Sequence, residues 1–231
     1  MSDDAEDDLD QLIRRVDPDR WLTSRFIADR RARADVLALY AFDHELARAC
    51  RVASTALLAE IRLTWWREAL DEIFADGPVR RHPVAEALRE AVRRHDLPRE
   101  PLEAMIDGQI ASLDIEFDAA ASLAWADAVE GSLAVAAAHV LDPGCAERAA
   151  LAGRAWGLAL LLRSGRAPDA LLRPMLASAI AEARAHAAAL SVAALPAALP
   201  ARLARFDLAG RSPGPLRKQL SLIGASATGR L

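Results

Sequence analysis

Apolar residues recur every three or four positions along most of this chain, which is the spacing of one face of an α-helix. A long helix is predicted over residues 33–52, whose apolar positions are Val36, Leu39, Tyr40, Leu46, Ala47 and Cys50. Ser54 is the predicted N-cap of the next helix, which extends to about Ala75. The apolar positions around Trp65 and Trp66 form two stripes, so this second helix is expected to be covered on more than one side.

Prolines and turn-forming dipeptides divide the rest of the chain into shorter helical segments. Helices are predicted over residues 9–16, 84–94, 98–117, 123–141, 174–191 and 216–223, with another around Trp156. A turn is expected at Asp76-Gly77-Pro78. Residues 1–8 are expected to form a disordered acidic tail. Because no repeat or linker separates the segments, residues 1–231 are predicted to form a single all-α domain.

The composition supports a folded helical domain and excludes several functional classes. Hydrophobic residues make up 53% of the chain and charged residues 27%, so the chain can bury a core. The formal net charge of −4 argues against a nucleic-acid partner. The two cysteines form no short-range pair, which fits a reducing compartment.

The N-terminal sequence lacks a basic segment followed by an apolar one, so no signal peptide is expected. The longest apolar run, residues 155–162, is far shorter than the ~20 apolar residues that span a bilayer. Together these features predict a cytoplasmic protein.

Short motifs occur in a fixed order through the first two thirds of the chain. They are Leu-Ala-Leu-Tyr-Ala-Phe at 37–42, Arg-Leu-Thr-Trp-Trp-Arg-Glu-Ala-Leu at 62–70, His-Pro-Val at 82–84, Leu-Pro-Arg-Glu-Pro at 97–101 and Gly-Ser-Leu at 131–133. In this order the stretch from 20 to 141 resembles the squalene/phytoene synthase family. The resemblance implies an all-α isoprenoid-synthase-type helical bundle around a central cavity.

Enzymes of that family join two prenyl diphosphates head to head. Divalent metal ions are needed because they neutralise the diphosphate leaving group. Mg²⁺ binds carboxylate and phosphate oxygens, and two aspartates spaced i, i+4 present their carboxylates on one face of a helix. The resemblance therefore implies two aspartate-rich motifs on helices that face each other across the cavity.

This sequence departs from the family at both motifs. Alignment on Tyr40 places Ala47 and Arg51 at the ligand positions of the first motif, and His44 at that of a phosphate-binding arginine. Alignment on Leu162-Arg163 places Leu160, Ser164 and Pro168 at the second motif. An arginine at a cation site would repel Mg²⁺. The residues predicted to line the cavity, without a catalytic or metal-binding role, are Tyr40, His44, Ala47, Arg51, Leu160 and Ser164.

The chain is most similar to a subgroup of the family that lacks these aspartates. That subgroup contains an assembly factor of mitochondrial respiratory complex I and relatives in alphaproteobacteria, and its Pro-Leu-Arg-x-Gln-Leu signature matches residues 215–220. The resemblance implies a bacterial pseudoenzyme without a cofactor. It would bind complex I subunits, or an isoprenoid or lipid ligand, at the inner membrane. The basic, amphipathic segment 216–223 could add a weak contact with an anionic membrane surface.

Two other functions remain open at this stage. An active prenyl transferase would need Mg²⁺ and relocated ligands, for which Asp114 and Asp118 are the candidates because they are spaced i, i+4 on the predicted helix 98–117. The alternative interpretation of these aspartates is a solvated helix end. An isoprenoid or lipid carrier would use the cavity without chemistry. Gly153 and Gly157 are interpreted as a site of close helix packing, since no phosphate-binding glycine motif is present.

Overall fold

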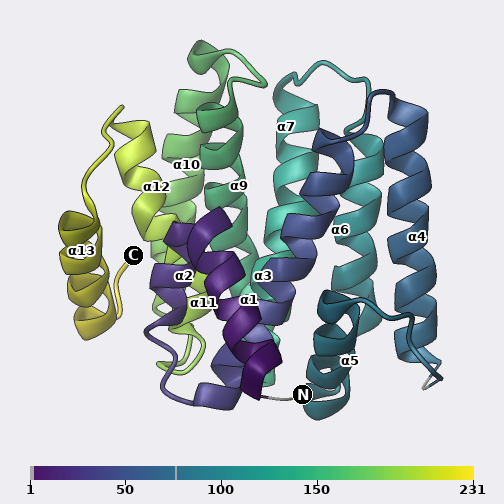
Figure 1. The fold of residues 1–231 in the computed structure, drawn as a ribbon. Coiled ribbons are helices and arrows are strands. Elements are labelled where there is room, and N and C mark those ends of the chain that lie inside the picture. The colour runs from purple at the N-terminus through teal and green to yellow at the C-terminus, as the bar shows by residue number, and fades with distance from the viewer. Residues whose placement is uncertain (1–2, 76) are drawn as a thin grey trace.

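The computed structural model describes residues 3–75 and 77–231, with side chains from residue 8 onward, and these form a bundle of helices (Figure 1). In chain order the helices are α1 (Asp3–Val16), α2 (Pro18–Ser24), α3 (Arg30–Arg51), α4 (Ala56–Phe74), α5 (Pro83–His95), α6 (Arg99–Ala111), α7 (Ala119–Trp125), the π-helix η1 (Ala126–Gly131), α8 (Ser132–Leu141), the 3-10 helix η2 (Pro143–Ala149), α9 (Ala150–Ser164), α10 (Asp169–Ala187), α11 (Leu195–Ala198), α12 (Pro200–Leu208) and α13 (Pro215–Thr228). The described part of the chain contains no strand. The predicted all-α class is therefore confirmed.

Several helix ends differ from the sequence-based prediction. Helix α1 begins at Asp3, so residues 3–8 form its first turns rather than a disordered tail. The N-cap of α4 is Thr55 and not Ser54, because the Thr55 hydroxyl accepts a hydrogen bond from the amide of Leu58 at 3.3 Å. Residues 1–2 of the expected tail and Asp76 of the expected turn lie outside the described residues.

The helix predicted over residues 98–117 is shorter than expected. Helix α6 ends at Ala111, and Asp114 has a φ angle of 53°, in the left-handed region that does not continue an α-helix. Asp118 then caps α7 by accepting a hydrogen bond from the amide of Ala121 at 2.7 Å. The local hydrogen-bonding capacity of aspartate thus outweighed the apolar periodicity on which the longer helix was predicted.

The alanine-rich helix also begins earlier than predicted. Helix α10 starts at Asp169 and includes Pro174, which had been taken as its first residue. Pro174 is exposed, so its ring faces solvent, and the helix continues past it. The helix ends at Ala187 instead of residue 191.

Helix α3 runs through the centre of the bundle. Every residue from Asp35 to Asp43 is buried, and α3 packs against α1, α4, α5 and α8. The buried apolar residues of α3 belong to one core. A second apolar core lies between α9, α10 and α12, with α13 at its edge (Figure 1). The charged groups described below lie where these two cores meet. No helix of the described residues has the length and apolar character needed to cross a membrane.

A close contact between α9 and η1 joins the two halves of the bundle. A Cβ atom added at Gly153 would lie 2.2 Å from the carbonyl oxygen of Glu130, and one at Gly157 would lie 2.9 Å from the Cβ of Ala126. Only glycine allows the backbones to approach so closely. The predicted packing role of Gly153 and Gly157 is therefore confirmed.

Candidate functional site

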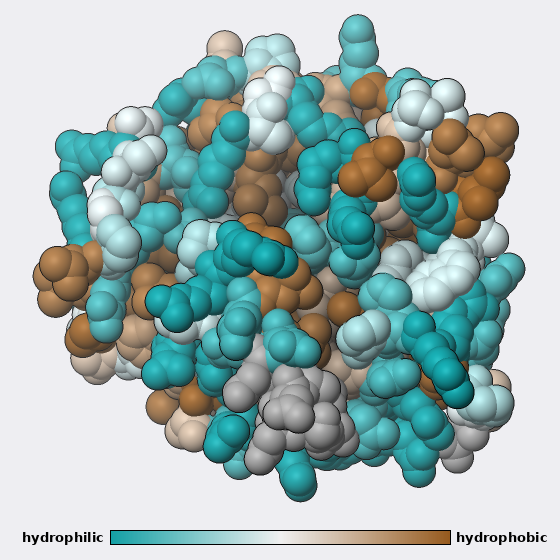
Figure 2. All heavy atoms as spheres, viewed as in Figure 1, coloured by the Kyte–Doolittle hydropathy of each residue, from teal (hydrophilic) through white to brown (hydrophobic). Residues whose placement is uncertain are grey.

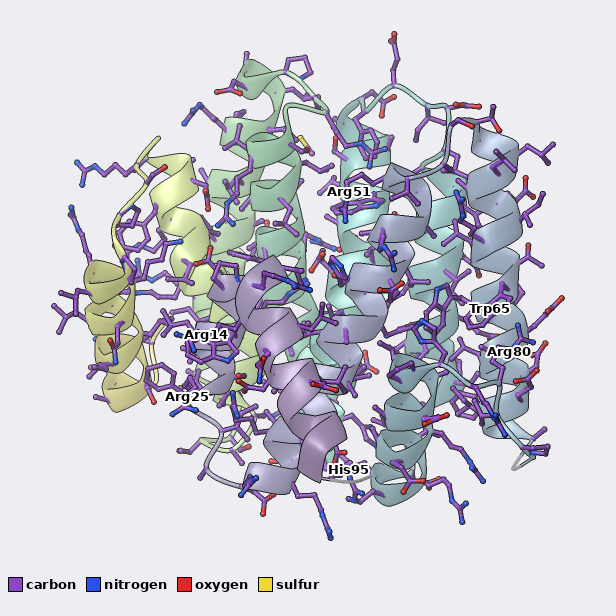
Figure 3. All side chains as sticks on the ribbon, in the orientation of Figure 1. Arg14, Arg25, Arg51, Trp65, Arg80 and His95 are labelled. Carbon is purple, nitrogen blue, oxygen red and sulfur yellow. The ribbon has the colours of Figure 1, made fainter. Side chains whose placement is uncertain are left out.

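One face of α3 carries the positions that correspond to the first aspartate-rich motif. Tyr40, Asp43, Ala47 and Arg51 follow one another at spacings of three or four residues, so their side chains lie on the same side of the helix. Tyr40 and Asp43 are buried, Ala47 is half-buried and Arg51 is exposed. Figure 3 shows Arg51 near the end of α3 that lies beside the top of α7. The face thus passes from the interior to the solvent.

The buried end of this face contains an ionic cluster around Arg20 of α2. The Nη1 atom of Arg20 donates to a carboxylate oxygen of Asp43 at 2.7 Å, and its Nη2 atom donates to Glu130. The Asp17 carboxylate lies 3.4 Å from Arg20 Nη1. The Arg20 guanidinium also lies 5.3 Å from the centre of the Tyr40 ring. The cluster therefore joins α2, α3 and η1.

Charges in the Arg20 cluster do not balance, because one guanidinium faces three carboxyl groups. Burial lowers the pKa of Arg20, but the nearby carboxylates of Glu130, Asp43 and Asp17 outweigh it and raise that pKa well above its ordinary value. Burial raises the pKa of Glu130 to about 8 and that of Tyr40 to about 12. Burial also raises the pKa of Asp17. With a pKa of about 8, Glu130 retains its proton near neutral pH.

A second ionic cluster surrounds Asp19. One Asp19 carboxylate oxygen accepts a hydrogen bond from Lys218 of α13 at 2.6 Å, and the other accepts one from Arg163 of α9 at 3.2 Å. Arg163 also donates to Asp207 of α12 at 2.6 and 2.7 Å. Its guanidinium lies 4.5 Å from the centre of the Trp156 ring. These contacts hold the C-terminal helices against α2 and α9.

The enclosed space beside the Arg20 cluster is small. Its volume is about 10 Å³, which is close to the minimum for one water molecule. Its lining residues are Arg20, Tyr40, Glu130, Leu133, Ala134, Ala152, Gly153, Trp156, Ala197 and Pro200. Side chains therefore fill the interior next to Tyr40.

The six residues predicted to line a cavity do not all share one environment. Tyr40 belongs to the Arg20 cluster, whereas His44 and Leu160 are half-buried and Ser164 is exposed. Burial lowers the pKa of His44, and the neighbouring Arg51 contributes to the same shift. The Ser164 hydroxyl donates to the carbonyl oxygen of Leu161 at 2.9 Å, as expected near a helix end. Cavity lining by these six residues stays a prediction.

The described residues do not fit the Mg²⁺ cluster that the family resemblance implies. No group of three or more His, Cys, Asp or Glu side chains in residues 8–75 and 77–231 is arranged so that it could hold a metal ion. Asp114 and Asp118 are exposed and lie outside any common helix, because α6 ends at Ala111 and Asp118 caps α7. Asp107 is also exposed and pairs with Arg67 at 2.5 Å. The helix on which Asp114 and Asp118 were expected to share a face is therefore not formed, and a metal site on these two residues stays a prediction.

Trp65 and Trp66 pack in an aromatic group. Trp66 lies edge-on to Phe42, Trp65 and His82, at ring-centre distances of 5.4, 4.9 and 5.0 Å. Arg80 covers the outer face of Trp65 at 4.6 Å, as Figure 3 shows on the α4 side of the bundle. This geometry supports the packing interpretation of the two tryptophans.

A model of the squalene/phytoene synthase family matches residues 13–166, which is more than half of the chain. The chain belongs to the squalene/phytoene synthase family. The match ends just after α9, so α10 to α13 lie outside the matched residues.

Relatives in this family include proteins named NADH dehydrogenase (ubiquinone) complex I, assembly factor 6. The protein from Bos taurus is 34% identical over 104 residues, and that from Homo sapiens is 32% identical over the same length. Each match covers 45% of this chain and 31% of the relative, so the chain spans about a third of the length of these relatives.

Two solved structures share the fold along nearly the whole chain. A dehydrosqualene synthase in complex with ligand has a TM-score of 0.79 and 16% identity, over 97% of this chain and 96% of the other. Squalene synthase HpnC from Alicyclobacillus acidocaldarius has a TM-score of 0.67 and 15% identity, over 97% and 94%. The fold is therefore the isoprenoid-synthase type predicted from the motifs.

The sequence did not predict Arg20, Asp43 and Glu130, the three residues that form the buried Arg20 cluster. Arg20 and Asp43 were not singled out, and Glu130 lies within the segment 123–141 that was predicted as a helix. A usable signal was present, because Glu130 is a carboxyl group within the apolar segment 123–141 and next to Gly131. A buried carboxyl group needs a partner, but the sequence does not say that the partner is residue 20.

Proposed function

We propose that this protein is a non-catalytic member of the squalene/phytoene synthase family and that it acts as a binding factor in the assembly of respiratory complex I. The observation that carries the first part is the presence of Ala47 and Arg51 where the family motif needs metal-binding aspartates. The names of the similar relatives support the second part.

The charges on α3 argue against a relocated metal site. Arg51 is exposed at the end of the helix, and Arg48 lies one turn before it on the same side as solvent. Arg48 is paired with Glu45 at 3.2 Å, so the guanidinium of Arg51 is the charge that raises the local positive potential and would oppose a divalent cation. Arg51 is compatible with an anion that binds without metal.

The Arg20 cluster supports a structural role for the interior. A buried ion pair contributes little net stability, but removing one partner leaves a costly unpaired charge. Arg20, Asp43 and Glu130 therefore fix how α2, α3 and η1 meet. The same three side chains occupy the interior next to Tyr40.

An isoprenoid or lipid carrier that holds its ligand beside Tyr40 is less well supported. Pockets that enclose small molecules usually measure roughly 300–1,000 Å³. The enclosed space beside Tyr40 has a volume of about 10 Å³. A prenyl chain could enter there only if the Arg20 cluster were taken apart.

The loss of catalysis can be tested by calorimetry. Mg²⁺ is titrated together with farnesyl or geranylgeranyl diphosphate into the purified protein, and each is also titrated alone. We expect no heat that depends on both Mg²⁺ and diphosphate. Metal-dependent binding or turnover would contradict the non-catalytic proposal and direct attention to carboxylates outside the two motif positions.

The assembly role requires a separate test in the organism that encodes the protein. Deletion is expected to lower the amount of fully assembled complex I on native gels, and expression of the wild-type chain is expected to restore it. Unchanged complex I in the deletion strain would contradict the assembly role alone. The non-catalytic proposal would still rest on the calorimetry.

A further inference from the structure

Four arginines line a hollow between α12 and α13. The hollow has a volume of about 410 Å³ and is lined by Arg202, Arg205, Phe206, Ala209, Arg211, Arg217, Leu220 and Ser221. We call its four arginines the C-terminal basic face. Arg202 is tied to α13 because its Nε atom donates to the Ser221 hydroxyl at 3.0 Å. The Arg217 guanidinium lies 5.9 Å from the centre of the Phe206 ring.

The positive charge of the C-terminal basic face is not neutralised by the protein. None of its four arginines has an ion pair with a carboxylate in the described part of the chain, and after Asp207 the sequence contains no Asp or Glu. Asp207 itself is engaged by Arg163. Burial lowers the pKa of Arg202, and the neighbouring guanidiniums of Arg205 and Arg184 lower it further. Because the whole chain carries a net charge of −4, this face is a local concentration of cations.

An unpartnered apolar face adjoins these arginines. Leu216, Leu220 and Ile223 are spaced i, i+4, i+7 on α13 and are 77%, 69% and 47% exposed. At the left edge of Figure 2, apolar side chains project from the position of α13 in Figure 1. Leu220 belongs to both groups because it also lines the hollow. The opposite side of α13 packs inward through Leu222 and Ala225.

From this arrangement we propose that α13 and the C-terminal basic face dock the protein on a bilayer surface that contains anionic phospholipids. Guanidiniums bind phosphate oxygens in the headgroups, and the leucine and isoleucine side chains enter the boundary between headgroups and acyl chains. A soluble anion would use the arginines but leave the apolar face in water. Charge and apolar area together therefore fit a membrane better than a free phosphate.

The contact is interfacial and does not span the bilayer. Helix α13 covers Pro215–Thr228, and no described helix is long and apolar enough to cross. The face lies beyond residue 166, where the match to the family model ends. The proposal does not depend on the role in complex I assembly.

Vesicle co-sedimentation tests the electrostatic part. The full chain is mixed with phosphatidylcholine vesicles and with vesicles that also contain phosphatidylglycerol. We expect binding only to the anionic vesicles, decreasing as salt is raised. The double variant Arg205→Gln with Arg211→Gln is expected to bind about 25-fold more weakly, since each of the two cations near an anionic surface contributes roughly fivefold. Both arginines are exposed and have no described polar partner, so the fold should persist.

A matched control removes the same charge elsewhere. Arg30→Gln with Arg31→Gln changes two exposed arginines at the start of α3 and is expected to leave vesicle binding unchanged. An equal loss in this control would show that net charge, and not the C-terminal basic face, determines binding. That result would overturn the proposal.

The apolar part is tested by Leu216→Ser with Leu220→Ser. Binding to anionic vesicles is expected to fall severalfold even at low salt. The control Leu57→Ser with Ile61→Ser changes exposed apolar residues of α4 that are 65% and 56% exposed, and it should bind like the wild type.

Absence of binding to anionic vesicles by the wild-type chain would overturn the proposal. Binding to soluble glycerol phosphate without vesicle binding would do so as well, and would identify a free anion as the ligand. Equal binding to neutral and anionic vesicles would also contradict it, because the arginines would then have no role. Circular dichroism and thermal unfolding of each variant exclude loss of folding as the cause.

Discussion

Glu130 is a buried carboxyl group in a largely apolar segment, and its pKa differs strongly from the ordinary value. Its carboxyl group is buried in η1 and shares Arg20 with Asp43. Burial raises its pKa from 4.5 to about 8. Between these values the folded protein retains a proton that the unfolded chain releases. This group therefore lowers the free energy of unfolding as pH rises through the window.

Glu130→Gln is expected to remove this pH dependence while keeping an acceptor for Arg20. Between about pH 5 and about pH 8, the free energy of unfolding of the wild type should decrease by roughly 1–3 kcal/mol more than that of Glu130→Gln. Urea denaturation at both pH values measures the difference. The exposed Glu60→Gln on α4 is the control and should keep the wild-type dependence. An unchanged slope in Glu130→Gln would mean that Glu130 is ionised across the window.

Gly153 is the residue most sensitive to added volume. Its Cβ would lie 2.2 Å from the carbonyl oxygen of Glu130, and backbone atoms cannot move aside as a flexible side chain could. Gly153→Ala is expected to lower the free energy of unfolding by about 3 kcal/mol.

Gly224→Ala on α13 is the matched control for this substitution, because nothing lies within 4 Å of the added Cβ. It should be neutral or stabilise by about 0.5–1 kcal/mol. Chemical denaturation of both variants decides the comparison. Equal stability of Gly153→Ala and the wild type would refute the close approach of α9 and η1.

Among the helices, the break between α6 and α7 contradicts the hypothesis that Asp114 and Asp118 lie on one helix. Asp114 and Asp118 would share a helix face if α6 continued, as the apolar pattern indicated. The chain instead turns at Asp114 and restarts with Asp118 as N-cap. Both aspartates therefore have local roles in chain geometry, which is a common use of this residue type.

Asp118→Ala is expected to lower the free energy of unfolding by about 1 kcal/mol, because the amide of Ala121 loses its capping acceptor. Its affinity for Mg²⁺ in calorimetry should equal that of the wild type. Glu116→Ala changes an exposed residue of the same connection and should leave stability unchanged. A Mg²⁺ signal that disappears in Asp118→Ala would reopen the relocated metal site.

At the scale of the whole molecule, prenyl transfer in this family needs two carboxylate motifs that face each other. The double variant Ala47→Asp with Arg51→Asp restores only the positions on α3. We expect no metal-dependent binding of geranylgeranyl diphosphate, because Leu160 and Ser164 stand at the positions predicted for the second motif and supply no carboxylate. Calorimetry against the wild type tests this. Binding by the double variant would show that one motif suffices.

The sequence alone predicted much of the fold. Proline and glycine positions and the 3.6-residue apolar period located most helices, because both signals act within one or two turns. It was less successful where side chains compete for backbone groups, as at Asp118, or where a helix changes its hydrogen-bonding pattern, as at η1. Of the predicted site residues, Tyr40 is buried beside Arg20, whereas Arg20 and Glu130 were not predicted from the sequence.

The sequence by itself determined the helical class, the family resemblance and the packing role of Gly153 and Gly157. Each of these depends on residue identity at fixed spacing. Only the tertiary structure decided that Arg20, Asp43 and Glu130 meet, because residues 20 and 130 come from helices far apart in the chain. The same holds for the C-terminal basic face, whose net charge depends on which carboxylates the fold brings near and which it keeps away.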